Sequence, residues 1–406
     1  MQKVIITAFA IALAAGAAAP ANAESWDACR KVETYPGREW RPVAPGAYGW
    51  NAETLLDAKS KFEIMQSASV VVVHKGRLIA DWGDSAERFT AQSVRKGLLN
   101  SLVGVLVDDG KLSLDDTLAD LGIDDIDPPL TDMEKTATLR DLLHSRSQIY
   151  HSALYEVGQW KRVRASLDEQ KRNAGAGAFK PGAMWIYNNW DFNALGTIVE
   201  QASGKSIGAL FQQEIAKPIG MQDFRLSDVE YTTKDHPAEQ HFNNVSEHRA
   251  YMFNISTRDL ARYGVLYSAC GKWKSRRIFS HEWALQSLDG IDTSIGRPEQ
   301  YSETGFGDYG FLWQVDRPGS RRYGSMGTRE PAYFATGNRG HLLAVFPYLD
   351  LIIAHQVGTR GGVSGEAQQK RATEGSPSAT DEEIANLMMA IIAAHPDGAT
   401  AFMEEE

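Results

Sequence analysis

Strand-forming segments lie at both ends of this chain, and helical patterns fill the long stretch between them. Residues 69–82 have the pattern of two β-strands joined by a tight turn at Lys75-Gly76. Apolar residues at helical spacing begin near Ser93, and strand patterns return only late in the chain, at 310–315, 341–346 and 351–355. This order predicts an α/β fold. Both chain ends form an antiparallel sheet flanked by helices, and a helical domain is inserted between them.

The same order sets the expected domain boundaries. We predict the α/β domain over residues 24–125 and 245–395, and the helical domain over residues 126–244. Residues 396–406 end in three glutamates and are predicted to form an acidic tail. An inserted domain leaves a cleft at its boundary with the main domain, which is a usual place for a ligand.

The first 23 residues have the pattern of a secretory signal peptide. Lys3 provides the basic start, residues 5–19 are apolar, and Ala21-Asn-Ala23 supplies the small residues of a cleavage site. A membrane anchor is the alternative, but the apolar run is short for a transmembrane span. We therefore expect a periplasmic or secreted protein that begins at Glu24 and keeps no stable membrane anchor.

Charge and cysteine content narrow the classes of partner. The formal net charge is −10, and no basic stripe accompanies it, so nucleic-acid binding is not expected. We expect a small-molecule substrate instead, and neither a metal nor another cofactor. Cys29 and Cys270 are the only cysteines. They could pair in an oxidising compartment or remain as two buried thiols, and the sequence leaves both open.

Ser93 and Lys96 form the first candidate catalytic pair. A serine hydroxyl is a weak nucleophile until a base takes its proton. On a helix, a lysine three residues later lies on the same face, and a neutral amine there could be that base. Arg95 lies between them in the sequence and should point away from both. About one such Ser-x-x-Lys pair is expected by chance in a chain of this length, so the pair alone is weak.

A second candidate motif lies at Tyr187-Asn188-Asn189. A tyrosine beside a cationic lysine loses its proton more easily, so Tyr187 could act as a base for the serine or pass a proton to a leaving group. The Asn189 amide can donate to a substrate carbonyl. The alternative is that Tyr187 is a polar loop residue and Asn189 a helix cap.

Ser-x-x-Lys followed by Tyr-x-Asn resembles the motifs of the penicillin-recognising serine hydrolases, in particular the branch related to class C β-lactamases. The segments 71–82, 139–143, 187–196 and 256–264 also look like members of that branch. It contains class C β-lactamases, D-alanyl-D-alanine carboxypeptidases and aminopeptidases, family VIII esterases and 6-aminohexanoate-dimer hydrolases. The resemblance implies a β-lactamase/transpeptidase-like fold and an acyl-enzyme on Ser93, with Lys96 and Tyr187 sharing the proton transfers.

The third motif of that branch departs from its usual form here. Relatives carry Lys-Thr-Gly or His-x-Gly on a late edge strand, whereas this chain has Ala335-Thr336-Gly337. The resemblance makes the Asn338 backbone N–H the second oxyanion donor beside that of Ser93, with Gly337 next to it. Arg339 could supply the missing positive charge or simply face solvent. The Gly-Asn-x-Gly run is closer to the 6-aminohexanoate-dimer hydrolases than to true β-lactamases.

A further departure is the segment 145–151, in which relatives commonly have Ser-Gly. Tyr150, His151 and Tyr155 could line the cleft, or at least one of them could serve only in packing. The leading hypothesis is a serine hydrolase for a small amide or ester. The alternatives are a β-lactamase or D-alanyl-D-alanine carboxypeptidase, and a non-catalytic binding protein that retains the fold.

Overall fold

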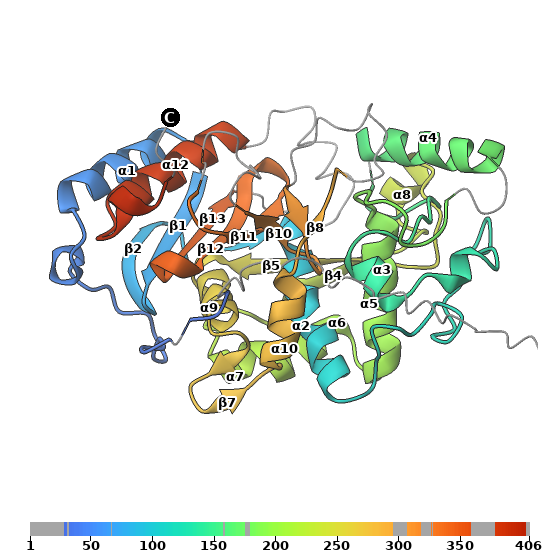
Figure 1. Ribbon diagram of the computed structural model, residues 1–406, viewed down its shortest axis with the longest axis horizontal. Helices are drawn as coiled ribbons and strands as arrows, with labels where there is room; N and C mark the ends of the chain where they lie inside the picture. The colour runs from blue at the N-terminus through green and yellow to red at the C-terminus, as the bar shows by residue number, and fades with distance from the viewer. Residues whose placement is uncertain are drawn as a thin grey trace, which may run out of the picture.

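An eight-stranded antiparallel sheet organises the molecule (Figure 1). A computed structural model describes residues 28–30, 32–65, 67–156, 159–174, 179–294, 307–317, 326, 328–358 and 378–402. The predicted signal peptide and the last four residues therefore lie outside the described residues. The strand order is β2-β1-β13-β12-β11-β10-β9-β8, so the amino-terminal hairpin pairs with the last strand of the chain. The predicted sheet from both chain ends is confirmed.

The bounds of the strands follow the sequence pattern closely. Lys75 and Gly76 both have positive φ angles, 51° and 74°, as the tight hairpin turn between the first two strands requires. The strands of the large sheet are β1 (Ser67–His74), β2 (Arg77–Gly83), β8 (Ile291–Asp292), β9 (Asp308–Tyr309), β10 (Gln314–Asp316), β11 (Ala332–Gly337), β12 (His341–Phe346) and β13 (Leu351–Val357).

Two corrections concern the late strands. β10 begins at Gln314 and not at Gly310, because Leu312 has a φ of 64° and interrupts the extended backbone. β11 was expected to be an edge strand, but β10 pairs with its first half, from Ala332 to Phe334. In the register of these two strands, only the Ala335–Gly337 end of β11 lies beyond the last pair with β10.

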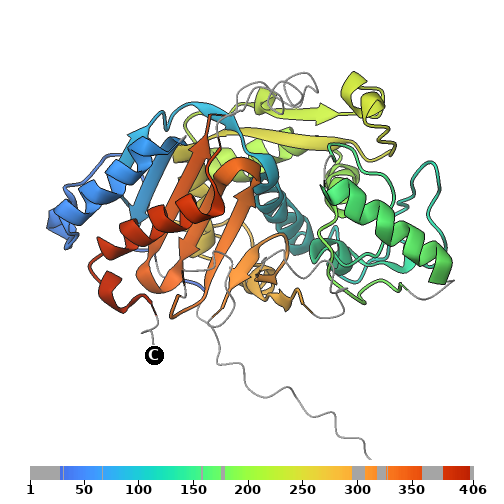
Figure 2. The ribbon, with the colours of Figure 1, turned by 90° about the horizontal axis from the view of Figure 1, so that it is seen from above.

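Both faces of the sheet are buried, as the run of valines in β1 requires. Val70 and Val72 pack into the apolar cluster under α1 (Ala52–Ile64) and α12 (Asp381–Ala393), whereas Val71 and Val73 pack into the larger cluster on the other face. Figure 2 shows α1 and α12 side by side over the sheet. The opposite face is covered by α9 (Thr257–Ser268) and, at β11, by α2 (Arg95–Asp108).

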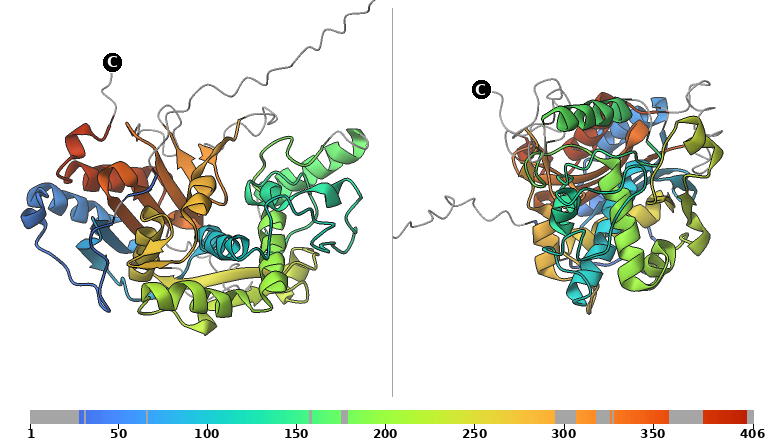
Figure 3. Two further views of the ribbon diagram at one scale, coloured as in Figure 1. Left: turned by 60° about the horizontal axis from the view of Figure 1, so that its bottom comes forward. Right: turned by 90° about the vertical axis from the view of Figure 1, so that its right-hand side faces the viewer.

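Helices and loops beyond α2 form the rest of the molecule, and α2 packs between the sheet and α5 (Figure 3). A small sheet with the order β3-β5-β4 crosses this part. Its strands are β3 (Arg88–Thr90), β4 (Val229–Thr232) and β5 (Ala250–Ser256). The other helices of this part are α3 (Leu139–Leu143), α4 (Gln159–Ala174), α5 (Asn189–Ser203), α6 (Ile207–Phe211), α7 (Lys217–Ile219), α8 (Pro237–His241) and α10 (His281–Leu288). The strands β6 (Lys272–Trp273) and β7 (Arg276–Arg277) form a two-stranded ribbon.

The carboxy-terminal segment packs more firmly than an acidic tail would. Ala401 is fully buried, and Phe402 forms an isolated bridge with Thr328. The acidic residues that suggested a tail follow Phe402 and lie outside the described residues. In the parts of the chain that the structure describes, no helix combines the length and apolar character that crossing a bilayer requires.

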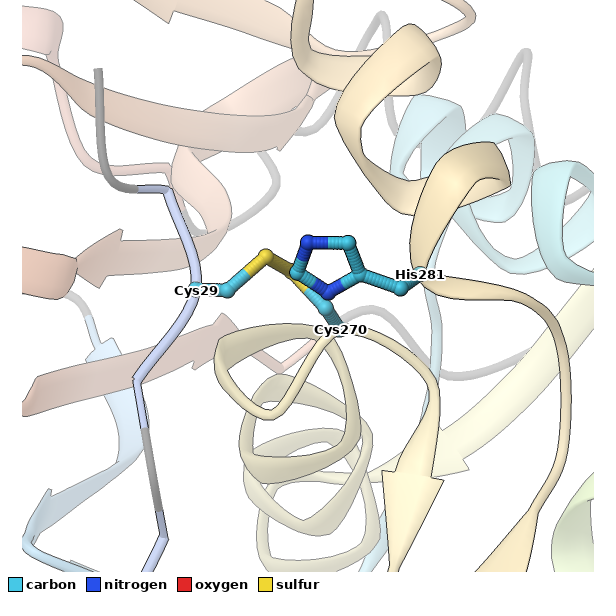
Figure 4. Close-up of side chains that lie close together, drawn as sticks. All are labelled: Cys29, Cys270 and His281. Carbon is cyan, nitrogen blue, oxygen red and sulfur yellow. A yellow bond between two sulfur atoms is a disulfide. The ribbon is translucent and has the colours of Figure 1, made fainter. Parts of the chain in front are cut away.

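Cys29 and Cys270 form a disulfide with a Cα–Cα distance of 5.4 Å, one of the two arrangements that the sequence leaves open. It fastens the amino-terminal arm to the end of α9, across 241 residues of chain. The His281 ring lies beside it (Figure 4). Within the described residues, these three side chains are the one group spaced for a metal ion. Two sulfurs bonded to each other are not thiolates, so the disulfide form does not offer a zinc-type ligand set.

Candidate active site

Ser93 lies in a single 3-10 turn, Gln92–Val94, that leads directly into α2. This places the half-buried hydroxyl of Ser93 at the amino-terminal end of a buried helix. Lys96 follows in the first turn of α2 and is 2% exposed. Its Nζ is 2.8 Å from Ser93 Oγ, so the three-residue spacing brings the two groups together as predicted.

Tyr187 completes a closed triangle with this pair. Its hydroxyl is 2.6 Å from Lys96 Nζ and 2.8 Å from Ser93 Oγ. The Phe192 ring packs edge-on against the Tyr187 ring, with 5.1 Å between centroids, and both rings lie within 5 Å of Lys96 Nζ. Apolar groups therefore surround the amine and keep water from it, while each of the three polar atoms contacts the other two.

Burial is the main reason that the pKa of Lys96 is lowered well below its usual 10.5. The positive charge of Arg95 lowers this pKa further, whereas the negative charge of Glu156 raises it. Arg95 is buried and packs over the Tyr251 ring, with its Cζ 4.4 Å from the ring centroid. The lowered pKa gives Lys96 a larger fraction of neutral amine, the form that can accept a proton from a serine.

The turn that carries Tyr187 is held by side chains whose role the sequence did not reveal. Ser145 Oγ donates to the Ile186 carbonyl at 2.7 Å and accepts from the Asn188 N–H at 2.9 Å. Asn188 is also the cap of α5, where its side chain accepts from Trp190 N–H. Ser145 therefore fixes the backbone on both sides of Tyr187. The unusual segment 145–151 thus supports the backbone of Tyr187.

Asn189 is the first residue of α5 and not its cap. Its Nδ2 lies 3.5 Å from Glu156 Oε1, at the outer limit of a hydrogen bond. Glu156 is 2% exposed, and Arg164 Nε donates to its other carboxylate oxygen at 2.6 Å. No sequence motif marks Glu156, and its one distinguishing feature in the sequence is an acidic side chain within a largely apolar stretch.

The end of β11 lies against the Ser93 turn because its residues are small. A Cβ built on Gly337 would meet the Ala91 carbonyl oxygen at 2.7 Å and the Gln92 Cβ at 3.0 Å. One on Gly97 of α2 would meet the Ala335 Cβ at 3.1 Å. Both glycines therefore permit the close approach of strand and helix.

This contact places the predicted oxyanion segment near Ser93. Asn338 follows Gly337 directly and is exposed, while Arg339 is half-buried with a φ of 71°. Arg339 is held through its backbone, since its carbonyl accepts from Ala379 N–H at 3.0 Å. The next residue is also anchored, since the Gly340 carbonyl accepts from His355 Nδ1 at 2.6 Å.

The prediction that Tyr150 lines the site is corrected. Tyr150 is 1% exposed and packs with Leu167 and Met184 in a small separate cluster, and its hydroxyl donates to Gln148. His151 is also largely buried and faces Glu134, with 3.3 Å between Nε2 and Oε1. Tyr155 does reach the site, because its hydroxyl donates to Gln92 Oε1 at 3.3 Å. Gln92 immediately precedes Ser93 in the sequence.

Comparisons with known proteins identify the family and the fold. The Beta-lactamase family model matches residues 55–373. No curated protein matches the chain. Among solved structures, a Bacillus anthracis protein named as a candidate 6-aminohexanoate-dimer hydrolase is similar, with a TM-score of 0.56, 16% identity and coverage of 92% of this chain and 89% of the other.

Two other solved structures are comparably similar. A candidate β-lactamase from Bacteroides dorei has a TM-score of 0.55 at 17% identity, over 84% of this chain and 99% of the other. A penicillin-binding protein homologue from Caulobacter crescentus has a TM-score of 0.54 at 15% identity, over 85% and 99%. At such low identity, these structures show the shared fold alone. The family model covers most of the sequence, and the chain belongs to the β-lactamase family.

Proposed function

We propose that this protein is a serine hydrolase that cleaves a small amide or ester through an acyl-enzyme on Ser93. The observation that carries the proposal is the closed triangle of Ser93, Lys96 and Tyr187, with distances of 2.6–2.8 Å and a buried lysine of lowered pKa. A structural role does not require a buried amine beside two hydroxyls, whereas a neutral amine in this place can serve as the base that activates a serine.

The first half of the proposed reaction transfers the acyl group. Neutral Lys96 takes the proton of Ser93 as Oγ bonds to the substrate carbonyl carbon, and the carbonyl electron pair moves onto its oxygen. That oxygen becomes an oxyanion that the backbone N–H groups of Ser93 and Asn338 would stabilise. When the oxyanion collapses, the bond to the leaving group breaks. The proton held by Lys96 passes to the leaving group through the Tyr187 hydroxyl.

The second half repeats these steps with water. Lys96, directly or through the Tyr187 hydroxyl, takes a proton from water as the water oxygen attacks the acyl carbon. The bond from that carbon to Ser93 Oγ then breaks, Oγ regains a proton from Lys96, and the acid product leaves. The lowered pKa of Lys96 supports the lysine as the base in the first step, because the amine is already neutral in a larger fraction of molecules. Tyr187 touches both other groups and would relay the proton.

A hydrolysis screen tests the proposal. Purified protein is assayed with p-nitrophenyl esters, D-alanyl peptides and 6-aminohexanoate oligomers, next to Ser93→Ala and the control Ser60→Ala. Ser60 is an exposed serine of α1. We expect hydrolysis of at least one substrate by the wild type and by Ser60→Ala, and its loss in Ser93→Ala. Full hydrolysis by Ser93→Ala would refute the proposal.

Family membership favours a β-lactamase or D-alanyl-D-alanine carboxypeptidase as the second candidate. Nitrocefin turnover, or stable labelling by a fluorescent penicillin that Ser93→Ala abolishes, would support it. Ala335 argues against it, because a small apolar side chain stands where related enzymes carry a cation. We therefore place the amide or ester hydrolase first.

We also propose that the protein acts outside the cytoplasm on a small molecule. The signal-like first 23 residues and the Cys29–Cys270 disulfide support export, since disulfides persist in oxidising compartments. Amino-terminal sequencing of the protein from a periplasmic or secreted fraction should find Glu24 as the first residue. Recovery of the intact amino terminus from the cytoplasm would contradict this.

A further inference from the structure

Gln92, which precedes Ser93, and Tyr155, whose side chain contacts Gln92, both have a strained backbone. Gln92 has a φ of 52° and Tyr155 has a φ of 60°. This left-handed region is unfavourable for non-glycine residues, and it persists only where the surroundings enforce it. The side chains of the two residues meet, with the Tyr155 hydroxyl donating to Gln92 Oε1 at 3.3 Å. The strain therefore occurs at both ends of one contact next to Ser93.

A buried carboxylate holds Tyr155 in this conformation. Both carboxylate oxygens of Glu239 accept from the Tyr155 backbone N–H, each at 3.1 Å. Glu239 belongs to α8, lies 84 residues further along the chain and is 2% exposed. Asn244 Nδ2 donates to Glu239 at 2.8 Å and so fixes the carboxylate in turn.

The neighbours of Tyr155 are anchored in the same way. Asn193 Nδ2 donates to the Leu154 carbonyl at 3.0 Å, and Asn244 Nδ2 donates to the Glu156 carbonyl at 3.0 Å. The segment around Tyr155 has no regular secondary structure, yet side chains from α5 and from the loop after α8 hold it in place. The proposed acyl transfer uses neither Tyr155 nor Gln92, so the reaction steps do not explain this arrangement.

We propose that Tyr155, together with Gln92, forms a wall of the substrate pocket beside Ser93 and limits the size of the apolar group that a substrate can carry there. The phenol hydroxyl is turned toward Gln92, so the ring rather than the hydroxyl would face a substrate, and an aromatic ring favours apolar or planar groups. Glu239 is a positioning residue that acts through the Tyr155 backbone. This inference rests on the proposed hydrolase function and deepens it.

Two series of esters test this role. One varies the acyl chain from acetyl to octanoyl, and the other varies the alcohol. In Tyr155→Ala, the ratio of kcat/KM for the largest to the smallest ester should rise at least about tenfold in one series, the scale on which apolar pockets discriminate. Glu239→Gln should raise the same ratio by a smaller factor than Tyr155→Ala does, and the change should be mainly in KM and not in kcat. Tyr155→Phe keeps the ring and should keep the wild-type ratio.

Tyr48→Ala serves as the matched control, because Tyr48 is a partly exposed tyrosine of the amino-terminal arm. Labelling of Ser93 by a small fluorophosphonate shows whether each variant keeps a folded site, and Tyr155→Leu replaces Tyr155→Ala if the alanine variant does not label. Labelled variants with wild-type ratios in both series would overturn the inference while leaving the hydrolase intact. A wild type that neither labels nor hydrolyses any ester would overturn both.

Discussion

His355 lies in the middle of β13 with both ring nitrogens hydrogen-bonded, and replacing it with glutamine tests how its protonation limits stability in acid. Nδ1 is 2.6 Å from the Gly340 carbonyl, which can only accept, so Nδ1 carries the proton of the neutral ring. Nε2 then accepts from Ser67 Oγ, also at 2.6 Å. A second proton on the ring would break this acceptor bond and leave a charge in the core.

Burial lowers the pKa of His355 from its usual 6.5 to about 4, and the bond to Gly340 opposes this only in part. Below pH 6.5 the unfolded chain binds a proton that the folded protein does not. Stability is therefore lost as the pH falls from 6.5 toward 4. With these two pKa values, linkage gives a loss of about 2 kcal/mol between pH 7 and pH 5 from this one side chain.

Urea unfolding followed by tryptophan fluorescence at pH 7 and pH 5 measures the effect. Glutamine offers an N–H and an oxygen but does not titrate, so His355→Gln should lose about 2 kcal/mol less than the wild type between the two pH values. The control His241→Gln changes an exposed histidine of α8 and should keep the wild-type pH dependence. Equal pH dependence in His355→Gln and the wild type would refute the reasoning.

Three further predictions concern the site and the amino-terminal arm. Lys96→Met should lower kcat/KM by about 10²- to 10⁴-fold, the range for general acid–base catalysis, without a lower melting temperature, because a buried amine becomes an apolar group. Activity within tenfold of wild type would exclude Lys96 as the base. Gly337→Ala should lower kcat about 10- to 100-fold by pushing on the Ala91 carbonyl, which displaces the Ser93 turn. The control Gly46→Ala, whose added Cβ has no neighbour within 4 Å, should be fully active. Cys29→Ser should lower the free energy of unfolding by about 2–4 kcal/mol, and wild-type protein treated with a reductant should match it.

The contact between Ser93 and Lys96 could be predicted from the sequence because it is local. Ser93 and Lys96 are three residues apart at the start of a helix, and helix geometry alone brings them together. Tyr187 required the resemblance to a family, since no local rule connects it to Ser93. The pairing of the two cysteines could not be predicted, because it depends on where 241 intervening residues place the arm.

The sequence could not show which of Tyr150 and Tyr155 faces the site. Both are tyrosines of one irregular segment, and no periodicity tells which of them faces the site. The structure places Tyr150 beneath α4 and turns Tyr155 toward Gln92, because Glu239 holds the Tyr155 backbone in a left-handed conformation. The placement of Tyr155 therefore depends on the carboxylate of Glu239, which is 84 residues away in the sequence. It could be found only after the fold had brought α8 next to this segment.

The structure shows what surrounds Ala335, which stands where the third motif of relatives has a cation. Ala335 is 4% exposed. A Cβ built on Gly97 of α2 would lie 3.1 Å from the Ala335 Cβ, so the strand and the helix are in close contact at this point. The close packing that the small residues allow also brings Gly337 against the Ser93 turn. Ala335 carries no charge that could attract an anionic substrate, and this agrees with the neutral amide or ester that we propose as the substrate.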